Sequence, residues 1–273
     1  MNAKLPFMPG RPAKPRQEGI TMMMDKGLSV AQVESFVESS GEFTDLVKFG
    51  FGTSLLAKEL QKKIDVYKAG GVRPYFGGTL FEAFFVRGMV DDYRRYMDKF
   101  GIDLVEVSDG SVAMEQEEKL SSIESLAKDY TVLSEVGSKQ QGVVLSPDSW
   151  IEMMQNELKA GSWKVIAEAR ESGTVGIYNA DGSANVQLIE YIQSKLDTND
   201  ILWEAPSGKH QIWFIKMQGP NVNLGNIAPD IVVPLETLRL GVRGDTFLDY
   251  LPEDIQEKRR QVVLPTYVID YQI

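Results

Sequence analysis

The stretch DLVEVSDGS at positions 103–111 contains the pattern on which the fold of this chain depends. A short run of apolar and β-branched residues ends in ionisable and glycine residues, and a helical stretch follows it. Successive runs of this kind begin about 20 to 40 residues apart, the length of one strand, one helix and two loops. The pattern predicts strands over Ile20–Asp25, Leu46–Gly50, Val72–Phe76, Asp103–Ser108, Thr131–Glu135, Lys164–Ala169, Ile201–Glu204 and Val222–Ile227.

The segments between these runs have the apolar spacing of helices. Leu28–Glu38 carries apolar residues one helical turn apart, and Ser29 can cap its first turn by accepting hydrogen bonds from backbone N–H groups. Leu80–Phe100 has similar spacing and stops at Gly101, a residue type that commonly follows a helix. Two further helices are predicted, from Pro147 to Gly161 and over Asn185–Leu196.

Eight alternating strand–helix units predict an α/β fold with a parallel sheet, and eight strands suffice to close it. We therefore predict a single-domain (β/α)8 barrel, the TIM barrel, over residues 19–250. An open, doubly wound sheet ranks second, because no predicted strand is followed by a GxGxxG phosphate turn. Residues 1–18 are expected to form an N-terminal arm and residues 251–273 a C-terminal tail.

The composition excludes several classes of function. The 273 residues include no cysteine, so disulfides, thiolate zinc sites, iron–sulfur clusters and a cysteine nucleophile are excluded. The formal net charge of −10 argues against nucleic-acid binding, which needs a basic surface. No apolar stretch approaches the roughly 20 residues of a membrane helix, and the basic start lacks the apolar run of a secretory signal. We expect a cytoplasmic protein with no membrane or nucleic-acid partner.

Ionisable side chains occur near the carboxyl ends of most predicted strands, where barrels of this type carry their active sites. Side chains alternate between the two faces of a strand, so Glu106 shares a face with Ser108. If these faces point inward, one mouth gathers Asp25, Lys48, Glu106, Glu135, Glu168, Arg170 and Glu204. Buried charges of this kind must be paired with one another, with a metal or with a substrate.

These residue types suit a reaction on small anions. Several carboxylates facing one cavity offer the oxygen ligands that Mg²⁺ prefers. Lysine and arginine side chains nearby can bind a phosphate or a sulfonate. The glycines at Gly77 and Gly78 allow backbone N–H groups to approach an anion closely.

Each residue taken singly has a simpler alternative. A lone glutamate at a strand end is more often an ion-pair residue than a ligand, and Glu168 with Arg170 can form a structural pair. The only histidine, His210, is expected where a helix begins, and capping or packing is its commoner role there. A Ser-His-Asp triad has no second candidate histidine. The whole set is therefore more informative than its members.

Long ordered segments spread over residues 14–246 give the chain a family resemblance. They are KPRQEGITMMMDKGL (14–28), DLVKFGFGTS (45–54), GGTLFE (77–82), VEVSDGS (105–111), LSEVGSK (133–139), ELKAGSWKVIAEARESGTVGIY (157–178), WEAP (203–206), GPNVNLGNI (219–227) and LRLGVRGDT (238–246). On these segments the chain resembles the phosphosulfolactate synthase family. Related plant heat-stress proteins look similar.

The resemblance implies a (β/α)8 barrel, dependence on Mg²⁺ and a homo-oligomer built on a three-fold arrangement. It implies addition of sulfite to C3 of phosphoenolpyruvate, giving (2R)-phospho-3-sulfolactate, which in methanogens leads to coenzyme M. It makes Lys139 the general acid that protonates C2, and Glu135 is the second catalytic candidate. The candidate metal ligands are Asp25, Glu106, Glu168 and Glu204. The candidate substrate-binding residues are Lys48, Arg170, Ser108, Gly77, Gly78, Asn223 and Asn226.

Two other functions stay open at this point. A lysine-dependent aldolase on the same barrel would use Lys48 or Lys139 to form a Schiff base. A non-catalytic stress or interaction protein would retain the barrel without the reaction.

Overall fold

The strands of the computed structural model, which describes residues 3, 5–137, 145–169 and 176–260, form a closed barrel. Each strand pairs in parallel with the next one along the chain, and β8 pairs back with β1. The predicted single-domain (β/α)8 barrel is therefore confirmed, and the open sheet is excluded. The strands are β1 (Thr21–Asp25), β2 (Leu46–Phe49), β3 (Arg73–Phe76), β4 (Leu104–Val107), β5 (Thr131–Val136), β6 (Ser162–Ala167), β7 (Ile201–Glu204) and β8 (Leu224–Ile227).

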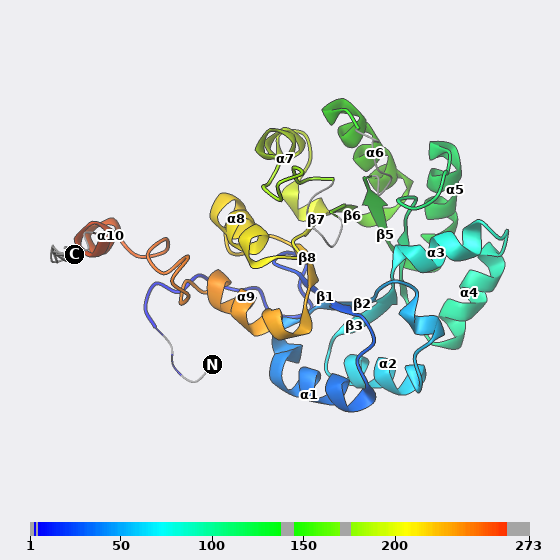
Figure 1. Cartoon of the computed structure of the whole chain (residues 1–273), viewed down its shortest axis with the longest axis horizontal. Coiled ribbons are helices and arrows are strands. Elements are labelled where there is room, and N and C mark those ends of the chain that lie inside the picture. The colour runs from blue at the N-terminus through cyan, green and yellow to red at the C-terminus, as the bar shows by residue number, and fades with distance from the viewer. Residues whose placement is uncertain (1–2, 4, 138–144, 170–175, 261–273) are drawn as a thin grey trace, which may run out of the picture.

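A ring of helices surrounds the strands, and α10 lies apart from this ring (Figure 1). The helices are α1 (Val30–Ser40), α2 (Leu60–Ala69), α3 (Gly78–Phe85), α4 (Val90–Lys99), α5 (Gln116–Leu126), α6 (Pro147–Ala160), α7 (Val186–Gln193), α8 (Gly208–Gln218), α9 (Val232–Arg239) and α10 (Glu253–Arg260). None of the helices in these described ranges is both long and apolar enough to cross a membrane.

The helix boundaries follow local chemistry. Ser29 caps α1 as predicted, because its Oγ accepts a hydrogen bond from the N–H of Gln32 at 3.4 Å. The prediction of one helix over Leu80–Phe100 is wrong, since α3 and α4 are separated by a turn. Gly88 in that turn has a φ of 66°, a left-handed conformation that ends a right-handed helix.

Alternate strand positions point into the barrel. Their buried apolar cluster consists of Ile20, Met22, Leu46, Tyr75, Leu104, Leu133, Ile166 and Leu202. Side chains on a strand face the same way every second residue, so the next inward layer lies two positions further toward the carboxyl ends. On β2, β4, β5, β6 and β7, or directly after them, that layer consists of Lys48, Glu106, Glu135, Glu168 and Glu204. The layer of charged side chains, called the charged layer below, therefore lies directly on the carboxyl-terminal side of the buried apolar cluster.

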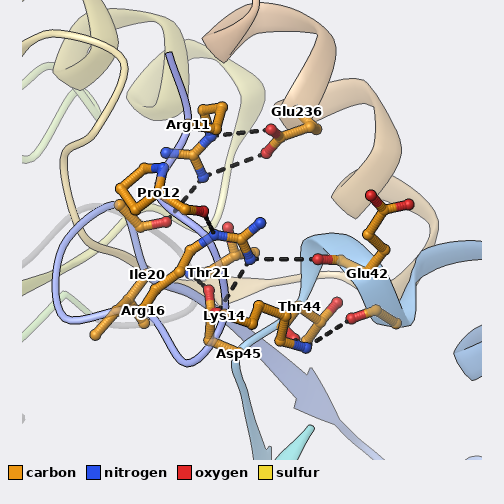
Figure 2. A network of polar contacts seen from close by, with 12 residues as sticks. Arg11, Pro12, Lys14, Arg16, Ile20, Thr21, Glu42, Thr44, Asp45 and Glu236 are labelled. Atoms are coloured by element: carbon orange, nitrogen blue, oxygen red, sulfur yellow. Dashed lines mark hydrogen bonds and ion pairs between the residues drawn. The ribbon is translucent and has the colours of Figure 1, made fainter. Parts of the chain in front are cut away.

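The N-terminal arm is fastened to the opposite, amino-terminal end of the barrel (Figure 2). Arg11 Nε lies 2.9 Å from Glu236 Oε1 on α9, and Arg16 Nη1 lies 3.1 Å from Asp45 Oδ1 just before β2. Asp45 also accepts a hydrogen bond from the N–H of Thr21, the first residue of β1, at 2.9 Å. The arm thus ties together the first two strands and the helix that follows the last one.

Arg239 at the end of α9 adds a buried contact at the same end. Its guanidinium donates to the carbonyl oxygens of Pro220 (2.6 Å), Val222 (2.7 Å) and Ile20 (3.2 Å). Burial lowers the pKa of Arg239 to about 9. These carbonyls precede β8 and β1, so Arg239 joins the strands at which the barrel closes.

Candidate active site

Five charged residues of the inward layer meet at the carboxyl end of the barrel. Lys48 Nζ lies 2.9 Å from Glu106 Oε1, 3.5 Å from Glu135 Oε2 and 3.7 Å from Glu204 Oε1. All of these side chains are buried. The structure thus gathers Lys48, Glu106, Glu135, Glu168 and Glu204 at one mouth, as the strand pattern predicted.

Three of these carboxylates lie close enough together to hold a metal ion. One oxygen each from Glu135, Glu168 and Glu204 lies within 4.8 Å of the others. Carboxylate oxygens are hard donors of the kind that Mg²⁺ prefers. The layer also holds four glutamates and one lysine within the described ranges, and a divalent cation would offset their excess negative charge. The donor set therefore fits Mg²⁺.

The charge of Lys48 is maintained by its neighbours. Burial alone would lower its pKa, but the carboxylates of Glu106, Glu135, Glu204 and Glu168 together raise the pKa well above its ordinary value. Lys48 is therefore an ammonium ion at neutral pH. A Schiff-base lysine needs a lowered pKa, so this environment disfavours Lys48 as the nucleophile of an aldolase.

Ser108 connects the charged layer to a glutamate that the strand pattern did not predict. Its Oγ lies 2.7 Å from Glu82 Oε1 and 2.9 Å from Glu135 Oε1. Glu82 lies on α3 and is only 2% exposed, and it also accepts a hydrogen bond from the N–H of Ser111 at 3.2 Å. The sequence could have pointed to Glu82, because it lies in the segment GGTLFE, which follows directly after β3 at the carboxyl end of the barrel.

Gly77 and Gly78 lie at the start of α3, against the charged layer. A Cβ on Gly77 would lie 2.8 Å from Lys48 Cε, and one on Gly78 would lie 2.6 Å from Glu106 Oε1. The N–H of Gly78 donates to Glu106. The close approach predicted for these glycines is present, and the anion that Gly78 meets is the carboxylate of Glu106.

The prediction that Asp25 joins this mouth is wrong. Asp25 shares its strand face with Met23, which packs in the outer core between strands and helices. Its Oδ2 lies 2.7 Å from Lys63 Nζ on α2 and 3.0 Å from the hydroxyl of Tyr67. The inward residue of β1 below the mouth is Met22, and Asp25 instead holds α2 against the barrel.

Asn223, directly before β8, and Asn226, within it, have different surroundings. Asn223, which was predicted to bind substrate, lies at the amino-terminal end of the barrel, away from the mouth: its Nδ2 donates to the carbonyls of Asn199 and Ile201, both at 3.1 Å. Asn226 lies near the carboxyl end of β8 with a left-handed φ of 58°. Its Oδ1 is buried and has no hydrogen-bond partner within the described ranges. A substrate role for Asn226 stays a prediction.

Two predicted site residues, Lys139 and Arg170, lie outside the described residues. Their roles as general acid and anion-binding residue stay predictions from the sequence.

A second buried cluster lies behind the charged layer, and the sequence pattern did not predict it. Lys119 on α5 is fully buried, with its Nζ 2.7 Å from Glu157 Oε1 on α6 and 2.8 Å from Asp109 Oδ1 after β4. Burial lowers the pKa of Lys119, but Glu157 and Asp109 raise it above its ordinary value overall.

His210 has a packing role, as its position at the start of α8 indicated. Its ring stacks on Tyr178 with 3.7 Å between ring centroids, and its Nε2 lies 3.0 Å from the carbonyl of Gly182. Both contacts are made at the carboxyl end of the strands, between the start of α8 and the segment after β6.

We expect stability to fall as the pH drops below about 6.5 through the titration of His210. Burial lowers the pKa of His210 below its ordinary value of 6.5, so the unfolded chain takes up the proton first. NMR titration of this single histidine, with urea unfolding between pH 5 and 7, measures both quantities. In His210→Phe the corresponding part of the pH dependence should be lost. A midpoint at or above 6.5 would contradict the prediction.

Comparison with known proteins agrees with this architecture. Residues 9–245 match the family model described as (2R)-phospho-3-sulfolactate synthase (ComA). The chain is 40% identical over 252 residues to the phosphosulfolactate synthase of Methanothermobacter thermautotrophicus, covering 90% of this chain and 98% of that one. It is 40% identical over 243 residues to the Bacillus subtilis enzyme of that name, covering 88% and 96%.

A plant relative is more distant. The chain is 25% identical over 260 residues to the protein HEAT-STRESS-ASSOCIATED 32 of Arabidopsis thaliana, covering 84% of this chain and 88% of that one. The family model and the two relatives at 40% identity span nearly all of the barrel. The chain therefore belongs to the (2R)-phospho-3-sulfolactate synthase family.

Proposed function

We propose that this protein adds sulfite to C3 of phosphoenolpyruvate, in a Mg²⁺-dependent reaction that yields (2R)-phospho-3-sulfolactate. The proposal depends on one observation above all: four buried carboxylates surround Lys48 at the carboxyl end of the barrel. Barrels of this type carry out their chemistry at that end. The names of the relatives at 40% identity support the choice of reaction.

The reaction makes one bond and requires one proton. The sulfur of sulfite bonds to C3, and the π electrons between C2 and C3 move to C2 and into the substrate carboxylate. A general acid then protonates C2, and the phosphate ester stays intact. Mg²⁺ bound by Glu135, Glu168 and Glu204 would supply positive charge that stabilises the enolate-like state.

The charged layer determines how anionic reactants can bind. Phosphoenolpyruvate and sulfite would be repelled by four carboxylates, so the site needs additional positive charge. The ammonium of Lys48 is in contact with Glu106, Glu135 and Glu204, and it orders those carboxylates. We propose that the metal, Arg170 and Lys139 provide the charge that the substrates meet.

The Lys139→Ala variant is expected to lose turnover by about 100-fold or more, the effect of removing a general acid. The measurement is kcat at saturating Mg²⁺ and substrates, with Lys128→Ala, an exposed lysine after α5, as the control. Full turnover in Lys139→Ala would exclude this lysine as the proton donor.

The deciding experiment follows phosphoenolpyruvate by ³¹P and ¹³C NMR, with sulfite or Mg²⁺ omitted in turn. We expect a product with sulfur on C3, formed only when both are present. In D₂O the product should carry deuterium at C2, because the last proton comes from an exchangeable group. Sulfite-independent substrate trapping by borohydride would favour the aldolase. No consumption of substrate under any condition would favour a non-catalytic protein.

We also propose a homo-oligomer built on trimers, as the family resemblance implies. Light scattering coupled to size-exclusion chromatography tests this, and a monomeric mass would contradict it.

A further inference from the structure

We infer that Lys119 is a positioning residue that fixes Glu135 and thereby the arrangement of the metal-binding carboxylates. Lys119 does not belong to the charged layer and lies behind it, between α5 and α6. The inference rests on the proposed Mg²⁺ site, and it adds a residue that acts on that site from outside the mouth.

The Lys119 ammonium has three close oxygen neighbours from three separate elements. Its Nζ lies 2.7 Å from Glu157 Oε1, 2.8 Å from Asp109 Oδ1 and 2.6 Å from the backbone carbonyl oxygen of Glu135. The contacts to Asp109 and to the Glu135 carbonyl are hydrogen bonds, and the contact to Glu157 is an ion pair. Because the acceptors come from α6, the segment after β4 and strand β5, the group cannot turn without breaking contacts to separate elements.

Two of these contacts bear on Glu135, one directly through its backbone and one through the neighbouring residues Asp109 and Ser108. The first is the carbonyl of Glu135 itself, which fixes the peptide that carries the side chain. The second is Asp109, the neighbour of Ser108, whose Oγ lies 2.9 Å from Glu135 Oε1. Lys119 therefore constrains Glu135 through its backbone and through the hydroxyl beside its side chain.

A gain in stability does not by itself explain why a charged cluster is buried at this place. Lys119 and Glu157 are both fully buried, and an apolar pair of similar size usually serves stability as well as a buried ion pair does. An ion pair with directed hydrogen bonds differs from an apolar pair because it specifies orientation. Groups that orient metal ligands typically change metal affinity 10- to 100-fold when they are removed.

The chain provides a matched control in Lys63. Lys63 is 2% exposed, and its Nζ lies 2.7 Å from Asp25 Oδ2, so it too is a buried lysine paired with a carboxylate. Its contacts lie between α2 and the outer face of β1, away from the charged layer. The Lys63→Met variant therefore measures the stability lost with a buried ion pair when the position of Glu135 is not affected.

The experiment compares Lys119→Met with Lys63→Met. Mg²⁺ binding is measured by calorimetry without substrate, and unfolding is measured in the same Mg²⁺-free buffer. We expect similar losses of stability in the two variants. The Kd for Mg²⁺ should rise about 10- to 100-fold in Lys119→Met and stay within about two-fold of wild type in Lys63→Met. The Mg²⁺ concentration for half-maximal sulfite addition should shift in parallel.

Glu157→Gln is the second variant, in case Lys119→Met does not fold. It keeps the size of the side chain, releases one of the three contacts of Lys119, and should raise the Kd for Mg²⁺ by about 10-fold. An unchanged Kd in a folded Lys119 or Glu157 variant, or an equal rise in Lys63→Met, overturns the positioning role while the proposed reaction stands. A wild-type protein that forms product without binding Mg²⁺ overturns the metal site and the positioning role together.

Discussion

The Lys48→Met variant should lower the free energy of unfolding by about 3 to 5 kcal/mol, the typical cost of removing one partner from a buried ion pair. Lys48 is 6% exposed and contacts Glu106, Glu135 and Glu204. Methionine retains much of its length but provides no charge, so carboxylates that share one ammonium would repel one another. Urea unfolding at pH 7 in Mg²⁺-free buffer measures the loss.

The control for this variant is Lys62→Met. Lys62 has a side chain that is 56% exposed, and its nearest carboxylate, Glu59, is 3.9 Å away, so the expected change is within about 0.5 kcal/mol. Equal effects at the two positions would contradict the account of the charged layer.

The pH dependence gives an independent check on Lys48. Its folded-state pKa is raised above the ordinary 10.5, so its contribution to stability is fully present below about 10.5 and is lost as the pH rises through the folded-state pKa. The stability difference between wild type and Lys48→Met should therefore stay constant from pH 7 to about pH 10. A difference that shrinks around pH 8 would show that the lysine is neutral there.

The Glu135→Gln variant should lower kcat/KM by roughly 100- to 1000-fold, because it weakens the hold on the metal ion that would stabilise transition-state charge on that scale. Glutamine has the shape of glutamate, and its amide oxygen can still accept from Ser108. The substitution removes one of three charges from the metal-binding group and a weaker partner of Lys48. The loss should therefore come with weaker Mg²⁺ binding in calorimetry.

Glu124→Gln on the exposed face of α5 is the matched control and should leave both quantities unchanged. An unaltered Mg²⁺ titration in Glu135→Gln would remove Glu135 from the metal site. Weaker Mg²⁺ binding with unchanged turnover at saturating Mg²⁺ would limit its role to binding the metal.

The sequence predicted the barrel and the charged layer, because both depend on the two-residue period of strands. That period does not show which face points inward where both faces of a strand are buried. Strand β1 reads TMMMD and is buried on both faces, so its sequence does not show which residues point inward. The structure shows which residues point inward: Met22 faces the interior of the barrel, and Asp25 faces α2.

The residues that the sequence did not predict are buried charges on helices. Lysine and glutamate on a helix are usually solvent-exposed, so Lys63, Lys119 and Glu157 have nothing in their local sequence to distinguish them. Each is buried because an oppositely charged residue from a distant part of the chain packs against it. Such pairings follow from the packing of the whole barrel, which periodicity within one element cannot give.

The contacts at the amino-terminal end of the barrel can form only late in synthesis, because they join the two ends of the barrel sequence. Arg239 and Ile20 are 219 positions apart, and Arg11 and Glu236 are 225 apart. All eight strands end by Ile227, before either of these contacts can form during synthesis. A nascent chain can therefore contain every strand and still lack the bonds that fasten α9 to its first segment.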